Sequence, residues 1–253
     1  KKRKAGIGIF VIVLIITAVR VKSMDSHRIS GRILAENIAG PGMLRLVEQS
    51  MQSRARKTSV TEIAVKERKH PQAALTFDDG PDIRYTPLLL DGLKERNVRV
   101  SFFLLGEKVE QYPELVERMQ KEGHLVGNHT YHHVQLNKLN ETKAREEILK
   151  TNNLIYETTG VYPLYLRPPF GAWKKNLELC VEMLPVFWTI DTLDWKVQNT
   201  EKIVRTVQEQ IEDGAIILMH DEYDTSVEAA LQVVDELKAQ GYQLVTVDQL
   251  ILP

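Results

Sequence analysis

Residues 73–82 read AALTFDDGPD. A short apolar, β-prone run ends there in two adjacent carboxylates, Asp78 and Asp79, and Gly80-Pro81 then enforces a turn. Adjacent acids at the edge of an apolar core cost free energy unless a cation or hydrogen bonds compensate them. From this stretch alone, a cation site and a plain Asp-Gly turn explain the pattern equally well. In both cases the residues before Asp78 are predicted to form a buried strand.

Apolar runs of the same kind recur along the chain, with helix-like stretches between them. Strands are predicted at 73–77, 98–104, 125–128, 163–166, 186–190, 215–219 and 243–247. Helices are predicted at 86–96, 113–122, 141–159, 174–184, 200–212 and 225–240. Strands that alternate with helices indicate a parallel sheet, either open or closed.

Unusual polar residues follow the ends of five of these strands. They are Asp78-Asp79, His129, Arg167, Asp191 and His220. Side chains from five strand ends converge only where those ends form a ring or a single crevice. A (β/α) barrel with its site on the carboxyl-terminal face satisfies this condition. An open, doubly wound sheet is the alternative.

A histidine pair follows the third predicted strand. His129 and His133 stand at i,i+4, so on a helical turn they share one face and can bind one metal ion. An Asp from a neighbouring strand would complete a site of two histidines and one carboxylate, which leaves positions open for water. A surface pair of histidines without metal is the alternative.

Two further clusters are informative only in combination. Residues 167–171 read RPPFG, a stiff segment in which Arg167 could orient a carboxylate and the Phe170 amide could point into a site. An ordinary loop explains that segment equally simply. Asp191 and His220 together offer a carboxylate that could hold and charge an imidazole.

Five motifs, in this order, resemble those of the polysaccharide deacetylases, carbohydrate esterase family 4. They are TFDDGP, H-T-x-x-H, R-P-P-F-G, D-x-x-D-W and L-x-H, and the resemblance covers about residues 72–250. It implies a distorted (β/α)₇ barrel, in agreement with the seven predicted strands. It also implies a metal-dependent hydrolase that removes N-acetyl groups from N-acetylglucosamine residues of a polysaccharide.

The resemblance implies a base and a metal site. Asp78 matches the general base, and Arg167 matches the residue that steers it. Asp79, His129 and His133 match the ligands of a divalent ion, for which Zn²⁺ is expected and Co²⁺ is an alternative.

The resemblance also implies an acid and a binding wall. His220 matches the general acid, and Asp191 is assigned as the partner that tunes it. The backbone N–H of Phe170 matches the oxyanion donor, and Trp195 and Leu218 match the apolar wall around the acetyl group.

The expected substrate is cell-wall peptidoglycan. The Gly-Pro after Asp79 favours the N-acetylglucosamine branch, because the muramic-acid branch of the family tends to lack that Pro. Chitin oligomers, an exopolysaccharide or acetylated xylan are alternative substrates. A non-catalytic glycan-binding protein on the same barrel is a further alternative, disfavoured because all five motifs are intact.

The N-terminal part differs from the rest. An uncharged run at 5–19 lies between basic residues, and as a helix it would span about 22 Å, less than the roughly 30 Å of a bilayer core. Residues 1–22 are therefore predicted to be a short transmembrane signal anchor or, as the alternative, a cleaved signal peptide. The predicted location is the cell membrane, crossed once, with the catalytic domain outside; secretion after cleavage is the alternative.

Charge separates the remaining two segments. Residues 1–70 hold 15 Lys+Arg and 5 Asp+Glu, a net charge of +10, whereas residues 71–253 hold 18 and 29, a net charge of −11. Residues 23–70 are predicted to be a basic stalk or linker and residues 71–253 the catalytic domain. The acidic charge disfavours nucleic acid as a partner, and no protein partner is indicated. The single cysteine, Cys180, excludes an intrachain disulfide framework.

Overall fold

A computed structural model describes residues 69–173 and 183–251 of the chain. The predicted anchor at 1–22, nearly all of the predicted stalk and Cys180 lie outside these ranges, so those predictions stay predictions. Among the described residues, no helix combines the length and the apolarity that a membrane crossing requires.

The strands form one sheet whose paired neighbours all run parallel. They are β1 (Gln72–Asp78), β2 (Ser101–Leu104), β3 (Leu125–Asn128), β4 (Tyr165–Leu166), β5 (Leu184–Pro185), β6 (Ile190–Asp191), β7 (Ala215–His220) and β8 (Gln243–Leu244). Their order is β5-β4-β3-β2-β1-β7-β6, and β8 pairs with the start of β1. The predicted parallel sheet is therefore confirmed.

The two edges of this sheet are consecutive in the chain. β5 and β6 stand at opposite ends of the strand order, yet only residues 186–189 separate them. An extended chain of that length bridges at most about 18 Å, so the sheet must curl until its edges approach each other. No ladder joins β5 to β6 within the described ranges. A curled parallel sheet that is closed by the chain fits the predicted distorted barrel.

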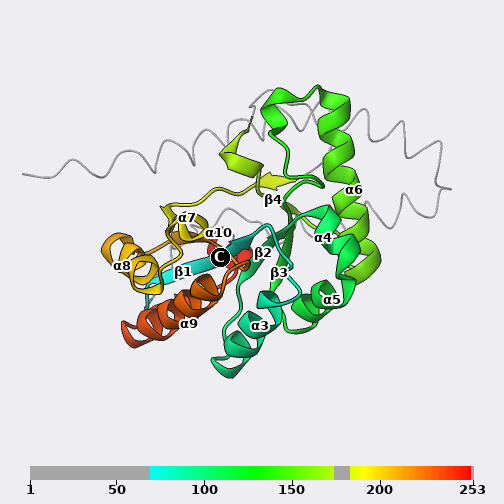
Figure 1. The fold of residues 1–253 in the computed structure, drawn as a ribbon. Helices are drawn as coiled ribbons and strands as arrows, with labels where there is room; N and C mark the ends of the chain where they lie inside the picture. The colour runs from blue at the N-terminus through cyan, green and yellow to red at the C-terminus, as the bar shows by residue number, and fades with distance from the viewer. Residues whose placement is uncertain (1–68, 174–182, 252–253) are drawn as a thin grey trace, which may run out of the picture. The chain divides into compact units, whose positions relative to one another are not determined.

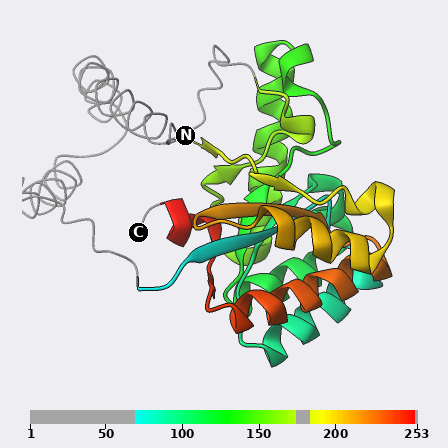
Figure 2. The same ribbon diagram turned by 90° about the vertical axis from the view of Figure 1, so that its left-hand side faces the viewer.

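Helices pack on the curled sheet, most of them on its outer face, whereas α10 contributes to the core on the opposite face. They are α3 (Tyr85–Glu95), α4 (Gly106–Gln111), α5 (Pro113–Lys121), α6 (Glu141–Thr159), α7 (Asp194–Val197), α8 (Thr200–Gln210), α9 (Asp224–Ala239) and α10 (Val247–Ile251), with 3₁₀ turns η1 (Leu136–Lys138) and η2 (Pro169–Gly171). Figures 1 and 2 show α3, α8 and α9 lined up along one side of the strands, with α5 and α6 continuing the layer.

Alternate residues of β1 face two different cores. Leu75 and Phe77 point into the main core, which fills the space between the strands and the covering helices. Ala74 belongs to a second cluster on the opposite face, where α10 contributes Val247. Side chains two residues apart on a strand point to the same face, so Thr76 and Asp78 face the same side as Ala74. β1 therefore directs Asp78 toward this second face.

Two sequence predictions need correction. The predicted strand 186–190 is divided, since residues 186–189 cross between the sheet edges and only the flanking β5 and β6 pair. Residues 106–111, for which the sequence predicted neither a strand nor a helix, form α4. The predicted helix 174–184 lies mostly outside the described residues, and Leu184 belongs to β5.

Candidate active site

The predicted polar residues meet at the carboxyl ends of the strands. Asp78 ends β1 and His220 ends β7, and the two residues are directly paired in the parallel register. His129 follows β3 and Arg167 follows β4, on neighbouring strands of the same sheet. Because all the strands run parallel, their carboxyl ends lie on one side, and the predicted convergence is confirmed for these four residues.

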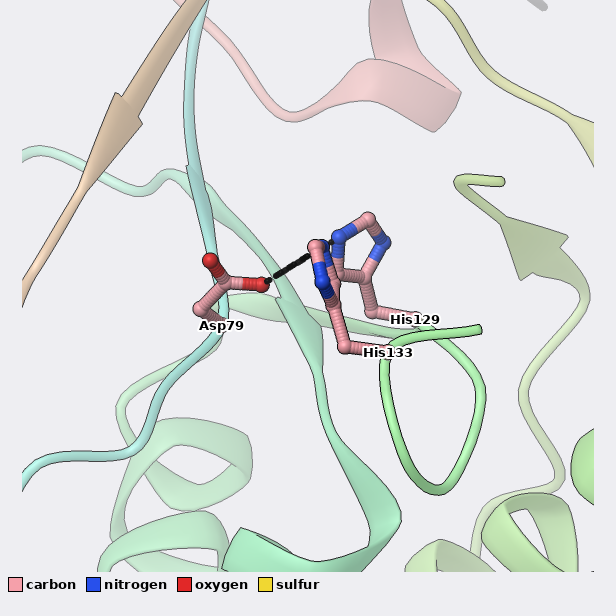
Figure 3. Close-up of side chains that lie close together, drawn as sticks. All are labelled: Asp79, His129 and His133. Carbon is pink, nitrogen blue, oxygen red and sulfur yellow. Dashed lines mark ion pairs between the residues drawn. The ribbon is translucent and has the colours of Figure 1, made fainter. Parts of the chain in front are cut away.

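Asp79, His129 and His133 form a cluster suited to a metal ion. The Oδ1 atom of Asp79 lies 3.3 Å from His129 Nε2 and 3.4 Å from His133 Nε2, and both imidazoles point at this carboxylate (Figure 3). One potential ligand atom from each residue lies within 4.8 Å of the other two. Two ligands held about 2.0–2.1 Å from a tetrahedral zinc ion lie about 3.3–3.4 Å apart. The observed separations therefore fit a shared divalent ion.

The Oδ1 atom of Asp79 also lacks any other partner. It is buried and accepts no hydrogen bond from the described residues. A buried carboxylate oxygen without a donor is costly, and a cation between the three side chains would compensate it. This feature supports a cation site over the plain Asp-Gly turn.

Charge at the cluster favours the ligand forms of these residues. Burial raises the pKa of Asp79, but the imidazoles of His129, His133 and His220 more than offset burial and lower that pKa to about 2. Burial lowers the pKa of His133, which favours its neutral ring. A charged carboxylate and a neutral imidazole are the forms that bind metal.

The i,i+4 spacing had suggested a helical turn, but the loop that carries both histidines is not helical. Thr130 and His133 have φ angles of 67° and 54°, in the left-handed region. The side chain of Asn128 accepts a hydrogen bond from the Thr130 amide at 2.7 Å. The Nδ1 atom of His129 lies 2.7 Å from the carbonyl oxygen of Arg167. A carbonyl only accepts, so Nδ1 carries the proton and Nε2 keeps its lone pair for the cluster.

Arg167 fixes the orientation of Asp78. Its Nη1 donates to Asp78 Oδ1 and to Thr76 Oγ1, both at 2.7 Å. The guanidinium is fully buried and lies over the ring of Phe103, 4.2 Å from its centroid. Burial lowers the pKa of Arg167 and the charge of Asp78 raises it. The other oxygen of Asp78 lies 3.7 Å from His129 Nε2, so it faces the cluster.

The partner of His220 is Asp194, and the assignment of Asp191 is wrong. Asp194 Oδ1 accepts from His220 Nδ1 at 2.7 Å, and its Oδ2 accepts from the His220 amide at 2.8 Å. Asp191 instead accepts a hydrogen bond from the Leu193 amide at 3.0 Å. Both acids belong to the D-x-x-D-W motif, and the left-handed conformation of Leu193 brings the second one to the imidazole.

This pairing keeps His220 cationic. Burial lowers the pKa of His220, but the hydrogen bond and charge of Asp194, helped by Asp78 and Asp79, raise it to about 9. The free Nε2 atom of His220 lies 3.9 Å from Asp79 Oδ2, on the side of the cluster. The ring thus presents a proton to the space beside the metal ligands.

The three remaining predicted residues lie in η2, α7 and β7. Phe170, in η2, has a φ angle of 59°, and its ring lies 4.5 Å from that of His133 between centroids. Trp195 lies in α7, half exposed, and Leu218 is buried in β7, two residues before His220. Sequence reasoning missed Asp194 as the His220 partner and Thr76 as the second acceptor of Arg167. The neighbouring positions of D-x-x-D-W and TFDDGP were the available signals.

Comparisons with known proteins agree with this geometry. A family model described as polysaccharide deacetylase matches residues 65–187. The peptidoglycan-N-acetylglucosamine deacetylase PgdA of Listeria monocytogenes is 41% identical over 185 residues, which are 73% of this chain and 40% of that protein. PdaC of Bacillus subtilis, named a peptidoglycan-N-acetylmuramic acid deacetylase, is 44% identical over 177 residues, 70% of this chain and 38% of that protein.

The chain thus spans about two fifths of the length of these relatives. The solved structure of peptidoglycan deacetylase PdaC from Bacillus subtilis matches with 42% identity and a TM-score of 0.70, across 72% of this chain and 91% of that one. Sequence motifs, curled parallel sheet and relatives all agree, and the chain belongs to the polysaccharide deacetylase family.

Proposed function

We propose that the chain is a metal-dependent N-deacetylase that hydrolyses the acetamide of N-acetylglucosamine residues in cell-wall peptidoglycan and releases acetate. One observation carries the proposal: a tethered carboxylate, a cluster of metal-ligand type and a cationic imidazole meet at Asp78, Asp79 and His220. The names of the relatives support the wall polymer as the substrate.

Asp79, His129 and His133 would hold the divalent ion, either Zn²⁺ or Co²⁺. When bound, such an ion polarises a carbonyl oxygen and acidifies a water molecule. The three donors and their separations suit this role, and the carbonyl of Arg167 keeps the His129 ring oriented for it.

The base and the acid are then separate residues. Asp78, with one oxygen held by Arg167, uses its other oxygen to accept a proton from the attacking water. His220, held cationic by Asp194, gives the proton from Nε2 to the departing sugar nitrogen. The products are acetate and a free amine.

Binding residues complete the site. The backbone N–H of Phe170 is proposed to stabilise the oxyanion, and one such donor is worth about 3–4 kcal/mol. Trp195 and Leu218 are proposed as the apolar wall for the acetyl methyl group. The left-handed conformation of Phe170 next to the His133 ring supports its placement at the reacting centre.

The N-acetylmuramic acid residue of the same polymer is the second candidate, because the relative from Bacillus subtilis that is 44% identical is named for that sugar. The Gly80-Pro81 step favours N-acetylglucosamine. Chitin oligomers, an exopolysaccharide and acetylated xylan require the same chemistry on a different polymer.

The location outside the cell membrane is part of the proposal. It rests on the apolar run at 5–19 with basic residues on both sides. A membrane-tethered enzyme would be held beside the wall polymer on which it acts.

Acetate release tests the proposal. The full chain is incubated with purified peptidoglycan and, in parallel, with a chitin oligomer, with and without a chelator, and Asp78→Asn serves as the inactive control. Muramidase digestion and mass spectrometry then show which sugar carries the free amine. We expect chelator-sensitive release from peptidoglycan with glucosamine as the product. Release from the oligomer alone would change the substrate, and release from neither with metal restored would refute the enzyme assignment.

A further inference from the structure

The loop that carries both metal-ligating histidines is held from a distant helix by one carboxylate. Glu147, in α6, accepts hydrogen bonds through Oε2 from the amides of Tyr131 and His132, at 3.0 and 2.9 Å. Its Oε1 lies 2.8 Å from His132 Nδ1. The Glu147 side chain is 15% exposed and the His132 side chain is 59% exposed, so the carboxylate is better shielded from water than the imidazole that it contacts. None of the five sequence motifs includes Glu147.

The loop needs such support. Thr130 and His133 both adopt left-handed φ angles, which cost free energy for residues with a Cβ atom. This backbone turns two successive N–H groups toward one point, an arrangement that binds an anion. Asn128 supports the start of the loop. Glu147 supplies the anion at its middle, between His129 and His133.

Tyr131 connects this carboxylate to the neighbouring helix. The Tyr131 hydroxyl donates to Glu110 of α4, and the ammonium of Lys150, one turn beyond Glu147, lies 3.4 Å from the centroid of the Tyr131 ring. The loop is thus held from both α4 and α6. His132, which has no place among the metal ligands, contributes a side-chain contact to Glu147.

We propose that Glu147 is a positioning residue for the metal site. Its carboxylate holds residues 131–132, and thereby keeps His133 where its Nε2 shares the Asp79 oxygen with His129. This inference rests on the metal site of the proposed function. Partners that orient ligands from outside a metal site are worth about 10- to 100-fold in metal affinity.

Metal affinity provides a test that does not depend on activity. The full chain and its Glu147→Ala, Glu147→Gln and His132→Ala variants are stripped of metal and titrated with Zn²⁺ against a chromophoric chelator. Co²⁺ absorption spectra report the ligand geometry. Glu146→Gln is the matched control, since Glu146 is the exposed neighbour of Glu147 on α6.

We expect Glu147→Ala to lose about 10- to 100-fold in affinity and to change the Co²⁺ spectrum. Glu147→Gln keeps an acceptor for the amides and should lose less. His132→Ala removes one hydrogen bond from an exposed side chain and should lose about two- to tenfold. Glu146→Gln should match the wild-type chain. Circular dichroism of the metal-free proteins checks that α6 is intact, and if Glu147→Ala fails to fold, His132→Ala and Glu147→Gln decide.

Unchanged affinity and spectra in the Glu147 variants, or an equal loss in Glu146→Gln, would overturn the inference. If the wild-type chain binds metal through this loop but releases no acetate, the proposed function fails and the positioning role stands. If the wild-type chain binds no divalent metal, the positioning role fails with the site.

Discussion

Asp194→Asn removes the negative charge that holds His220 cationic while nearly preserving the volume of the side chain. In the wild-type chain the pKa of His220 is raised from 6.5 to about 9, with Asp194 as the largest cause that raises it. A difference of about 2.5 pKa units corresponds to about 3 kcal/mol of preference for the protonated ring. Without the charge of Asp194, only Asp78 and Asp79 oppose burial, so the pKa of His220 should fall toward its ordinary value of 6.5.

The pH dependence of kcat/KM for acetate release measures this shift. The alkaline limb, which reports loss of the acid's proton, should move down by about two pH units in Asp194→Asn. At about pH 8 the variant should lose at least about tenfold in kcat, because most of its His220 is then neutral. A bound cation lowers the pKa of His220 in both proteins, so the difference between the two profiles is the quantity compared.

Asp191→Asn is the matched control. Asp191 accepts a hydrogen bond from the Leu193 amide, and Asn retains that acceptor, so the profile should stay near that of the wild-type chain. A shifted limb in Asp191→Asn together with an unshifted one in Asp194→Asn would refute the pairing. The same pairing stabilises the fold fully below about pH 6.5, and this contribution is lost as the pH rises through about 9.

Three further changes test the cluster and the cores. Asp79→Ala should lower metal affinity by at least about 100-fold in a chelator competition. This loss exceeds the one expected for a residue that only supports the ligands from outside, because Asp79 is itself a ligand. Retained affinity would contradict the metal site. Asp221 directly follows β7 and is fully buried. Burial raises its pKa from 3.8 to about 7, so the free energy of unfolding should fall as the pH rises from about 4 to 7. Asp221→Asn should remove that slope and add about 2–4 kcal/mol at about pH 8 in urea unfolding; an unchanged slope would contradict this. Phe77→Ala should cost about 3–5 kcal/mol in the same assay, because the ring is fully buried against Phe102; a cost below about 1 kcal/mol would contradict the packing.

The sheet was predictable because the strongest strand is buried on both faces. β1 therefore appears in the sequence as a continuous apolar run that ends in carboxylates. The stretch 186–190 looked similar, but its residues cross from one sheet edge to the other. Apolar, β-prone residues do not distinguish a paired strand from an extended crossing, in which here Val186 is buried but Phe187 is 42% exposed.

The histidine site was predictable in its members and not in its conformation. The spacing of His129 and His133 indicated a shared ion, but a helical turn was the wrong reason. Left-handed angles at Thr130 and His133 depend on contacts from Asn128 and Glu147, and i,i+4 spacing carries no information about them.

The acid's partner shows the same limit at shorter range. Asp191 and Asp194 are both aspartates of the D-x-x-D-W motif, and the sequence alone does not show which of them contacts His220. The choice between them depends on the left-handed turn at Leu193, where the sequence has neither Gly nor Asn to announce it.

The position of β1 in the strand order has a consequence for how the chain is made. Strand β7 pairs along most of β1. The Thr76 hydroxyl donates a hydrogen bond to the carbonyl oxygen of Ile217, 141 residues later in the chain. At about 5–20 residues per second, a ribosome adds that length in about 10–30 s. During this interval the side of β1 that will meet β7 is an apolar edge without its neighbour, the kind of surface that aggregates or recruits chaperones. His220 is the last residue of β7, so the pairing of β7 with β1 covers that edge and places the proposed general acid at the site in one step.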